Sequence, residues 1–147
     1  MIKIAIASDH AGFKLKEDLK NHFKNDYNFI DFGTDSSDSV DYPDFAHRLA
    51  KKISENKDSL GILICGSGIG MSMVANRYKC VRAALCLNEN MAKLSREHNN
   101  ANVLVLGSRL ISYKEAIKCF IMFFSSEFEG GRHQARLEKF NHVESIK

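Results

Sequence analysis

The chain has 147 residues, of which 44% are hydrophobic and 27% are charged, and its formal net charge is +3. These values are typical of one globular domain that is long enough to bury a core without disulfides or metal ions. Basic and acidic residues are interleaved, which argues against a nucleic-acid partner but remains compatible with a small anionic substrate.

Short apolar runs alternate along the chain with longer segments of helical period. Strands are predicted at 2–7, 28–33, 60–65, 81–86 and 102–107. Helices are predicted at about 11–25, 43–56, 67–76, 88–98 and 112–124. Because each continuous aliphatic strand is followed by a helix, we expect a parallel sheet covered on both faces. The predicted fold is a three-layer α/β/α sandwich with a five-stranded, Rossmann-like sheet, and residues 1–147 form one domain.

The last segment, 129–147, differs from the rest of the chain. It begins at a glycine pair and continues in a charged, helical pattern. We expect a C-terminal helix at about 130–145 that packs on a partner subunit, with a solvated terminal helix as the alternative.

The cysteines and the N-terminus indicate where the protein works. Cys65, Cys80, Cys86 and Cys119 form no CxxC pair and show no ligand spacing with histidine, so no zinc site is expected. The N-terminal run MIKIAIASDH is too short for a signal peptide, and no segment reaches the roughly 18 apolar residues that cross a bilayer. We therefore expect reduced thiols, a cytoplasmic location and no membrane contact.

Polar residues follow the predicted strands, where parallel sheets bind their ligands. The strand ends carry an acid, a histidine, a thiol, a hydroxyl and an arginine, in the runs Ser8-Asp9-His10, Gly33-Thr34-Asp35, Cys65-Gly66-Ser67, Leu87-Asn88 and Gly107-Ser108-Arg109. This edge of the sheet is the predicted site.

The run ILICGSGIGMS at 62–72 places Gly66, Gly68 and Gly70 between a strand and a helix. A dinucleotide-binding fingerprint would need glycine at position 71, and a Cys-x5-Arg phosphatase motif would need arginine there, but the residue is Met71. A Walker loop is also excluded, because no Gly-Lys-Ser/Thr follows the glycines. The glycines instead leave backbone N–H groups open to a phosphate or an oxyanion. A tight turn without a ligand is the alternative.

Cys65 differs from the other cysteines because it ends a strand beside a helix N-terminus, which favours a reactive thiolate. The other three cysteines are expected to be buried and inert.

Several further residues are candidates, each with a plainer alternative. Asp9 and His10 could act as a pair, or Asp9 could cap the following helix. His98 and Asn99 end a helix just before the fifth strand, and Arg109 follows that strand. Arg132 and Arg136 share a helical face that suits a phosphate, although such surface arginines are common. Tyr42 could contact a ligand or pack. His22, His47 and His142 are expected to have no role.

Seven segments together resemble the ribose-5-phosphate isomerase type B and sugar-phosphate isomerase family, in order and from the first strand to about residue 140. They are IASDHAGFKLK, DFGT, DYPDFA, GILICGSGIGMSMVANR, RAALC, LSREHNNANVLVLGSR and FEGGRHQARL. The resemblance implies a metal-free and cofactor-free aldose–ketose isomerase that interconverts ribose 5-phosphate and ribulose 5-phosphate through an enediolate. It also implies a homodimer or a dimer of dimers with shared active sites.

The resemblance assigns roles by position. Cys65 would move the proton between C1 and C2, as in the thiol branch of the family. Ser67, where the family often has threonine, would help exchange a proton between the substrate oxygens. The backbone N–H groups of Gly66, Gly68 and Gly70 would hold the enediolate. The remaining roles fall to His98 with Asp9 for ring opening, Asn99 and Tyr42 for sugar hydroxyls, and His10, Arg109, Arg132 and Arg136 for phosphate.

Two alternatives stay open at this point. The same chemistry could act on a six-carbon sugar phosphate, such as allose 6-phosphate or galactose 6-phosphate, because the sequence alone does not set the length of the pocket. A non-catalytic sugar-phosphate-binding module would carry the same fold but would not depend on Cys65.

Overall fold

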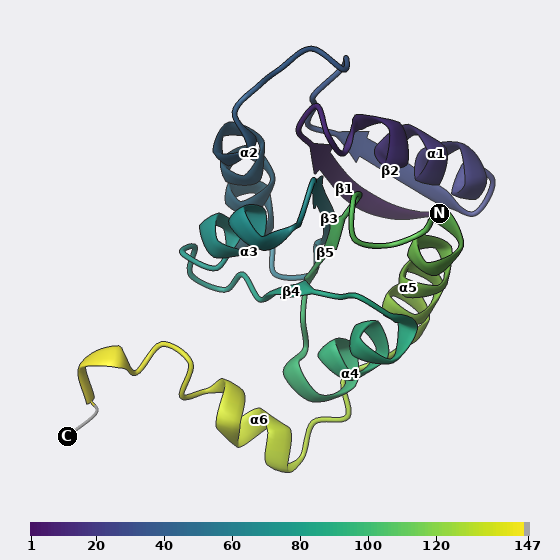
Figure 1. The fold of residues 1–147 in the computed structure, drawn as a ribbon. Coiled ribbons are helices and arrows are strands. Elements are labelled where there is room, and N and C mark those ends of the chain that lie inside the picture. The colour runs from purple at the N-terminus through teal and green to yellow at the C-terminus, as the bar shows by residue number, and fades with distance from the viewer. Residues whose placement is uncertain (146–147) are drawn as a thin grey trace.

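The computed structural model describes residues 1–145 and confirms the predicted sandwich of helices on both faces of a parallel sheet (Figure 1). The strands are β1 Ile2–Ser8, β2 Tyr27–Asp31, β3 Leu60–Cys65, β4 Ala83–Leu85 and β5 Val103–Gly107. The helices are α1 Phe13–Phe23, α2 Tyr42–Glu55, α3 Ile69–Ala75, α4 Glu89–Asn99, α5 Tyr113–Ser125 and α6 Arg132–Leu137, followed by a 3-10 turn, η1 Val143–Ser145.

The strands lie in the order β2-β1-β3-β5-β4, and every neighbouring pair is parallel. The chain runs outward from β1 to β2 and then crosses back, so that β3 pairs with the other side of β1. The strand order therefore reverses between β1 and β3, which is where open parallel sheets leave a crevice for a ligand. The loops that follow these two strands begin at Asp9 and Gly66.

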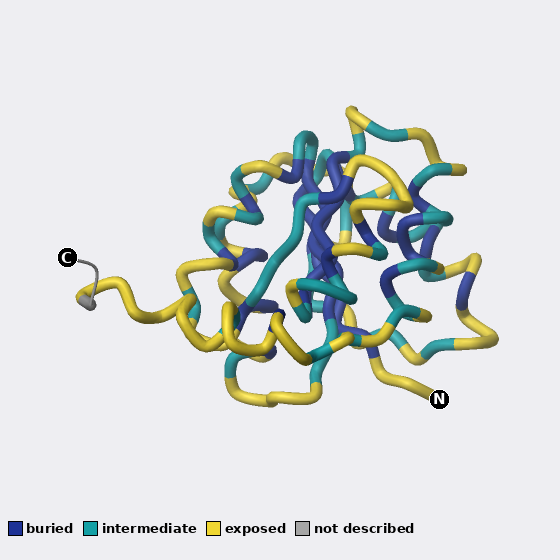
Figure 2. The backbone as a smooth tube through the Cα atoms, turned by 90° about the horizontal axis from the view of Figure 1, so that it is seen from below, coloured by how far each residue is buried: buried dark blue, intermediate teal, exposed yellow. Residues whose placement is uncertain are grey.

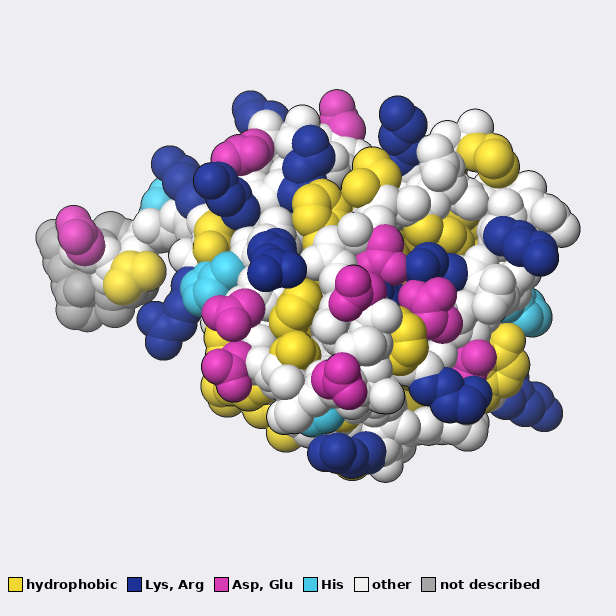
Figure 3. Space-filling model, turned by 90° about the horizontal axis from the view of Figure 1, so that it is seen from above, with side chains coloured by type: hydrophobic (Ala, Val, Ile, Leu, Met, Phe, Trp, Pro, Cys, Tyr) yellow, Lys and Arg dark blue, Asp and Glu magenta, His cyan; other side chains and the backbone are white. Residues whose placement is uncertain are grey.

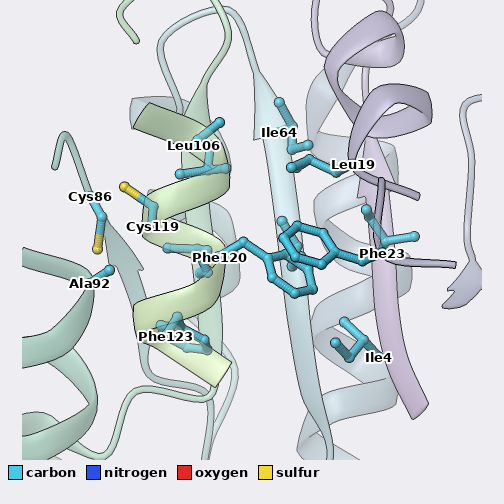
Figure 4. Packing of buried hydrophobic residues seen from close by; sticks show 14 of the residues in the cluster. Ile4, Leu19, Phe23, Ile64, Cys86, Ala92, Leu106, Cys119, Phe120 and Phe123 are labelled. Atoms are coloured by element: carbon cyan, nitrogen blue, oxygen red, sulfur yellow. The ribbon is translucent and has the colours of Figure 1, made fainter. Parts of the chain in front are cut away.

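Side chains alternate between the two faces of the sheet, as the pleat of a strand requires. In β1, Ile4 and Ile6 pack under α1, α4 and α5, whereas Ala5 and Ala7 pack under α2 and α3. On the first face, the rings of Phe23 and Phe120 stack at 3.8 Å between centroids (Figure 4). Both faces of each central strand are thus buried, which explains their continuous aliphatic sequences (Figure 2).

Several predicted elements are shorter than expected, and in two of them a local contact or conformation accounts for the difference. The strand expected at 81–86 is reduced to Ala83–Leu85, because the N–H group of Arg82 donates to the side chain of Asn102 at 2.8 Å. The helix expected at about 67–76 begins only at Ile69, since Gly68 has the left-handed φ of 76°.

The prediction of one C-terminal helix over about 130–145 is wrong. Helix α6 has six residues, and a turn separates it from η1. A helix this short is unstable unless it buries an apolar face, yet Phe140 is 51% exposed and Val143 is 80% exposed. The segment lies beyond the lower end of the sheet and extends away from it (Figure 1). Among the described residues, the two large apolar side chains after α6 are therefore at least half exposed.

Candidate active site

The carboxyl ends of β1, β3 and β5 are tied together by backbone hydrogen bonds. The N–H group of Asp9 donates to the carbonyl of Ile64 at 3.2 Å, and that of Ser108 donates to the carbonyl of Cys65 at 2.8 Å. Asp9 and Cys65 are 6% and 4% exposed. The acid and the thiol therefore flank the crevice in a fixed backbone frame.

The thiol of Cys65 faces the glycine loop. Its Sγ accepts a hydrogen bond from the backbone N–H of Gly68 at 3.1 Å. Gly68 has a φ of 76°, and a Cβ atom there would meet the side chain of Leu85 and the backbone of Leu106. Only glycine fits this position without strain, and this conformation aims the N–H group at the sulfur. A donor so placed stabilises negative charge on its acceptor.

The other two loop glycines permit close approach of larger side chains. A Cβ atom at Gly66 would lie 2.8 Å from Nη1 of Arg109, and one at Gly70 would collide with the ring of Tyr42. Arg109 and Tyr42 therefore lie directly against the loop that carries Cys65. The loop thus lies against a thiol, a guanidinium and a phenol, and the guanidinium is a strong donor to an anionic group such as phosphate.

Three other predicted residues already have partners at this edge. Oδ1 of Asp9 accepts from the N–H of Gly12 at 3.0 Å, so the capping alternative accounts for one of its oxygens. Nδ1 of His10 accepts from the N–H of Val40 at 3.1 Å, which assigns the proton of the neutral ring to Nε2. Oγ of Ser67 accepts from the N–H of Ile69 at 3.2 Å.

The remaining predicted residues lie at the opposite edge of the sheet, where the strands begin. His98 and Asn99 end α4 and precede β5, whose first residue pairs with Gly61 and whose last pairs with Cys65. Four strand steps of about 3.3 Å therefore separate the two edges by about 13 Å. Arg132 and Arg136 lie on α6, beyond that same edge (Figure 1). Within one chain, His98 and Asp9 are not neighbours.

Comparisons with known proteins show the family of this chain. The sequence model of a family described as Ribose/Galactose Isomerase matches residues 4–140. The chain belongs to that family. It is 49% identical over 139 residues to a probable ribose-5-phosphate isomerase B from Mycoplasma genitalium, covering 92% of this chain and 91% of the relative. Identity to the ribose-5-phosphate isomerase B of Escherichia coli is 40% over 145 residues, or 98% and 97% of the two chains.

Solved structures of the same family superpose closely. The ribose 5-phosphate isomerase from Thermotoga maritima has a TM-score of 0.93 and 51% identity, covering 97% of this chain and 99% of that one. The type B isomerase from M. genitalium, solved with bound ribulose-5-phosphate, has a TM-score of 0.92 and 46% identity, covering 99% and 98%. These matches confirm the α/β fold and the family resemblance.

The sequence analysis did not identify a buried lysine near the carboxyl end of β2. Lys16 is fully buried in α1, and its Nζ contacts both carboxylate oxygens of Asp31, at 2.7 and 2.9 Å, and the carbonyl of Thr34. Burial alone would raise the pKa of Asp31, but hydrogen bonds from Lys16, Lys20 and Gly33 lower it overall. The helical period was the available signal, because it places Lys16 on the face of Leu19 and Phe23.

The other three cysteines differ from one another. Burial raises the pKa of the Cys86 thiol to about 11 and that of the Cys119 thiol to about 12, so both stay protonated and inert as expected. The expectation that Cys80 is buried is wrong: it is exposed, in a turn where its own φ is 67°. Its sequence neighbours gave no indication of that turn.

One cluster of metal-ligating groups forms among residues 1–145 that the sequence did not indicate. Nε2 of His98 and Nε2 of His133 lie 3.8 and 3.5 Å from the same carboxylate oxygen of Glu129. The three residues come from α4, from the segment before α6, and from α6. Because Glu129 lies outside α6, helical spacing gave no signal for this cluster.

Charge on the face seen from above the sheet is mixed. Lysine and arginine side chains alternate there with aspartate and glutamate (Figure 3).

Among the described residues, no helix is long and apolar enough to span a membrane.

Proposed function

We propose that this chain interconverts D-ribose 5-phosphate and D-ribulose 5-phosphate, the reaction named for its type B relatives. The observation that carries the proposal is the glycine loop, which aims the Gly68 N–H at Sγ of Cys65 and lies under Arg109 and Tyr42. Proton transfer next to a carbonyl needs a base, a stabilised oxyanion and a fixed phosphate, and this edge offers a group for each task.

The proposed reaction starts from the ring form of ribose 5-phosphate. His98, with Asp9, opens the furanose by moving a proton between the ring oxygen and the C1 hydroxyl. The Cys65 thiolate then removes the proton from C2, and the electron pair moves to the C1 oxygen to give a cis-enediolate. Backbone N–H groups of the Gly66–Gly70 loop stabilise the charged oxygen, while Ser67 exchanges a proton between O1 and O2. Cys65 returns its proton to C1, which yields the ketose.

The proposed binding roles divide between the two edges. His10 and Arg109 hold the phosphate from the carboxyl edge, together with Arg132 and Arg136. Tyr42 and Asn99 bind sugar hydroxyls. No cofactor or metal ion takes part in the proposed steps.

One group of proposed site residues lies at the carboxyl ends of the strands and the other lies at their amino ends. The proposed site therefore needs a second copy of the chain. In a homodimer, His98, Asn99 and α6 of one protomer would reach the Cys65 loop of its partner. The half-exposed Phe140 on the extended C-terminal segment supports this arrangement. We infer that residues 1–147 act as one domain, that α6 lies at the dimer interface, and that the protein works in the cytoplasm, where its free thiols stay reduced.

Mixing two impaired variants tests the shared site. Cys65→Ala and His98→Asn chains, unfolded together and refolded, would form half of their dimers as heterodimers, each with one intact site. Activity should recover to about a quarter of the wild-type value, well above the residual activity of either variant refolded by itself. Absence of recovery, with dimers confirmed by light scattering, would contradict shared sites.

The ring-opening role has its own test. His98→Asn should slow the reaction of ribose 5-phosphate more than it slows the single-turnover proton exchange at C1 of ribulose 5-phosphate, which has no furanose to open. Equal losses in the two measurements would count against this role.

A six-carbon substrate is the second candidate, because the matching family description names galactose as well as ribose. Comparing kcat/KM for ribose 5-phosphate, allose 6-phosphate and galactose 6-phosphate tests both candidates at once. The proposal predicts that ribose 5-phosphate is preferred. Binding of all three without turnover would instead indicate a non-catalytic module.

A further inference from the structure

The cluster of His98, Glu129 and His133 is held in place by its own contacts. The backbone N–H of Glu129 donates to the carbonyl of Glu97 at 3.0 Å, which ties the segment before α6 to the last turn of α4. The rings of His98 and His133 stack at 4.3 Å between centroids, with their planes 14° apart. His133 is nine-tenths buried, while His98 and Glu129 remain open to solvent. An ion can therefore reach the cluster.

The spacing within the cluster is longer than that of hydrogen bonds. The distances of 3.5 and 3.8 Å from Oε2 of Glu129 to the two imidazole nitrogens exceed the range of an N–H···O bond, about 2.7–3.2 Å. Three ligands bound tetrahedrally at about 2.0–2.1 Å from a zinc ion lie about 3.4 Å from one another. All three ligand atoms lie within 4.8 Å of one another. Because the two imidazole rings are stacked with their planes 14° apart, one ring must rotate about its Cβ–Cγ bond before both nitrogens can bind the same ion.

We propose that His98, Glu129 and His133 form a binding site for a divalent transition metal ion of the zinc class. Two imidazole nitrogens and one carboxylate are ligands that zinc accepts, with water in the fourth position. Magnesium and calcium prefer oxygen ligands and fit the cluster poorly. The ion is not part of the isomerisation. A metal on Nε2 of His98 would block the proton transfer in ring opening, a consequence that rests on the proposed function.

Calorimetric titration of the chelator-treated full chain with zinc chloride tests the site directly. We expect one ion per chain, and we expect Glu129→Gln and His133→Asn each to raise the dissociation constant about 100-fold or more. Glu138→Gln, at the end of α6, and His47→Asn, on α2, are the matched controls and should bind as the wild type does. Because the exposed Cys80 can also bind zinc, the series is repeated with Cys80→Ser. Equal affinity in wild type, Glu129→Gln and His133→Asn would overturn the proposal.

A second measurement needs no variant and so does not depend on variant folding. Substoichiometric Co²⁺ should broaden the imidazole NMR signals of His98 and His133 before those of the other four histidines. Broadening that begins at other histidines would overturn the site.

Activity measurements separate this site from the proposed reaction. Zinc should slow the turnover of ribose 5-phosphate by the wild type, and His133→Asn should resist this inhibition about tenfold, although Cys65 is still present. A chain that isomerises but binds no zinc at the cluster rejects the site alone. A chain that binds zinc there but never isomerises rejects the proposed function alone.

Discussion

The carboxyl edge of the sheet and the C-terminal segment carry the two halves of the proposed site, and they are held in different ways. At the edge, Cys65 is buried and its loop is tied to β1 and β5 by backbone hydrogen bonds. Helix α6 packs against α4, and the described residues after it extend away from the sheet (Figure 2). The groups proposed for proton transfer are therefore preorganised within one chain, whereas those proposed for ring opening and phosphate binding need a partner to complete them.

The strongest test of this difference is removal of the thiol. Cys65→Ala should lower kcat by about 1,000-fold or more, because a positioned base contributes about 10²–10⁴ in rate, while KM changes little. Cys80→Ala, which removes the exposed thiol, should keep kcat within about twofold. Steady-state kinetics gives kcat and KM for both variants, and retained turnover in Cys65→Ala would exclude Cys65 as the base.

The buried lysine below the edge should matter for stability. Lys16→Met removes one of the two lysines that contact Asp31 at 2.7 Å and leaves Lys20 in place. We expect a loss of about 2 kcal/mol in the free energy of unfolding at pH 7, as for a hydrogen bond to a charged group. The pKa of Asp31 is lowered in the folded state, so its contribution is present above the unfolded value of about 3.9 and is lost as pH falls through the folded pKa.

Urea denaturation between pH 7 and pH 3 should therefore show the difference between Lys16→Met and wild type shrinking on acidification. Lys14→Met removes the exposed ion pair with Asp18 and is the control, with little effect expected at either pH. A difference that does not change with pH would mean that the loss comes from packing alone.

Glycine substitutions compare the two regions at equal backbone conformation. Gly68 and Gly130 have φ values of 76° and 68°, but a Cβ atom at Gly68 meets Leu85 and Leu106, whereas one at Gly130 meets nothing within 4 Å. Gly130→Ala should cost only the left-handed conformation, about 1 kcal/mol, and Gly68→Ala should cost about 2–3 kcal/mol. Thermal unfolding of the two variants measures both values. Equal losses would show that the loop relaxes as freely as the segment before α6.

The smallest expected effect on activity concerns the binding of the substrate phosphate. Arg136→Ala should raise KM for ribose 5-phosphate about tenfold with no change in the melting temperature, since its helix adds little to the core. Lys139→Ala, in the turn just after α6, is the matched control and should leave KM unchanged. A lowered melting temperature in Arg136→Ala would indicate a structural role instead.

The central strands could be predicted because their signal is local. The runs IKIAIA, LGILIC and NVLVLG are apolar on both faces, and a strand buried on both faces has no other stable environment. The C-terminal helix could not be predicted in this way. Its charged, helical pattern at 130–145 is the same whether or not a partner covers it, and without burial it shortens to Arg132–Leu137.

Residue types and the carboxyl ends of the predicted strands were enough to propose Cys65, Ser67 and the glycine loop as site residues, since parallel sheets bind ligands at those ends. They did not place His98, because its distance from Cys65 depends on which edge of the sheet the end of α4 reaches. They also missed Lys16, which contacts Asp31, and His133, whose ring stacks on that of His98, because these partners lie 15 or more residues apart in the chain. The sequence by itself determined the layers, the thiol and the loop, because these follow from local periodicity. Tertiary structure alone decided which charged groups meet, since that depends on how helices cross the sheet.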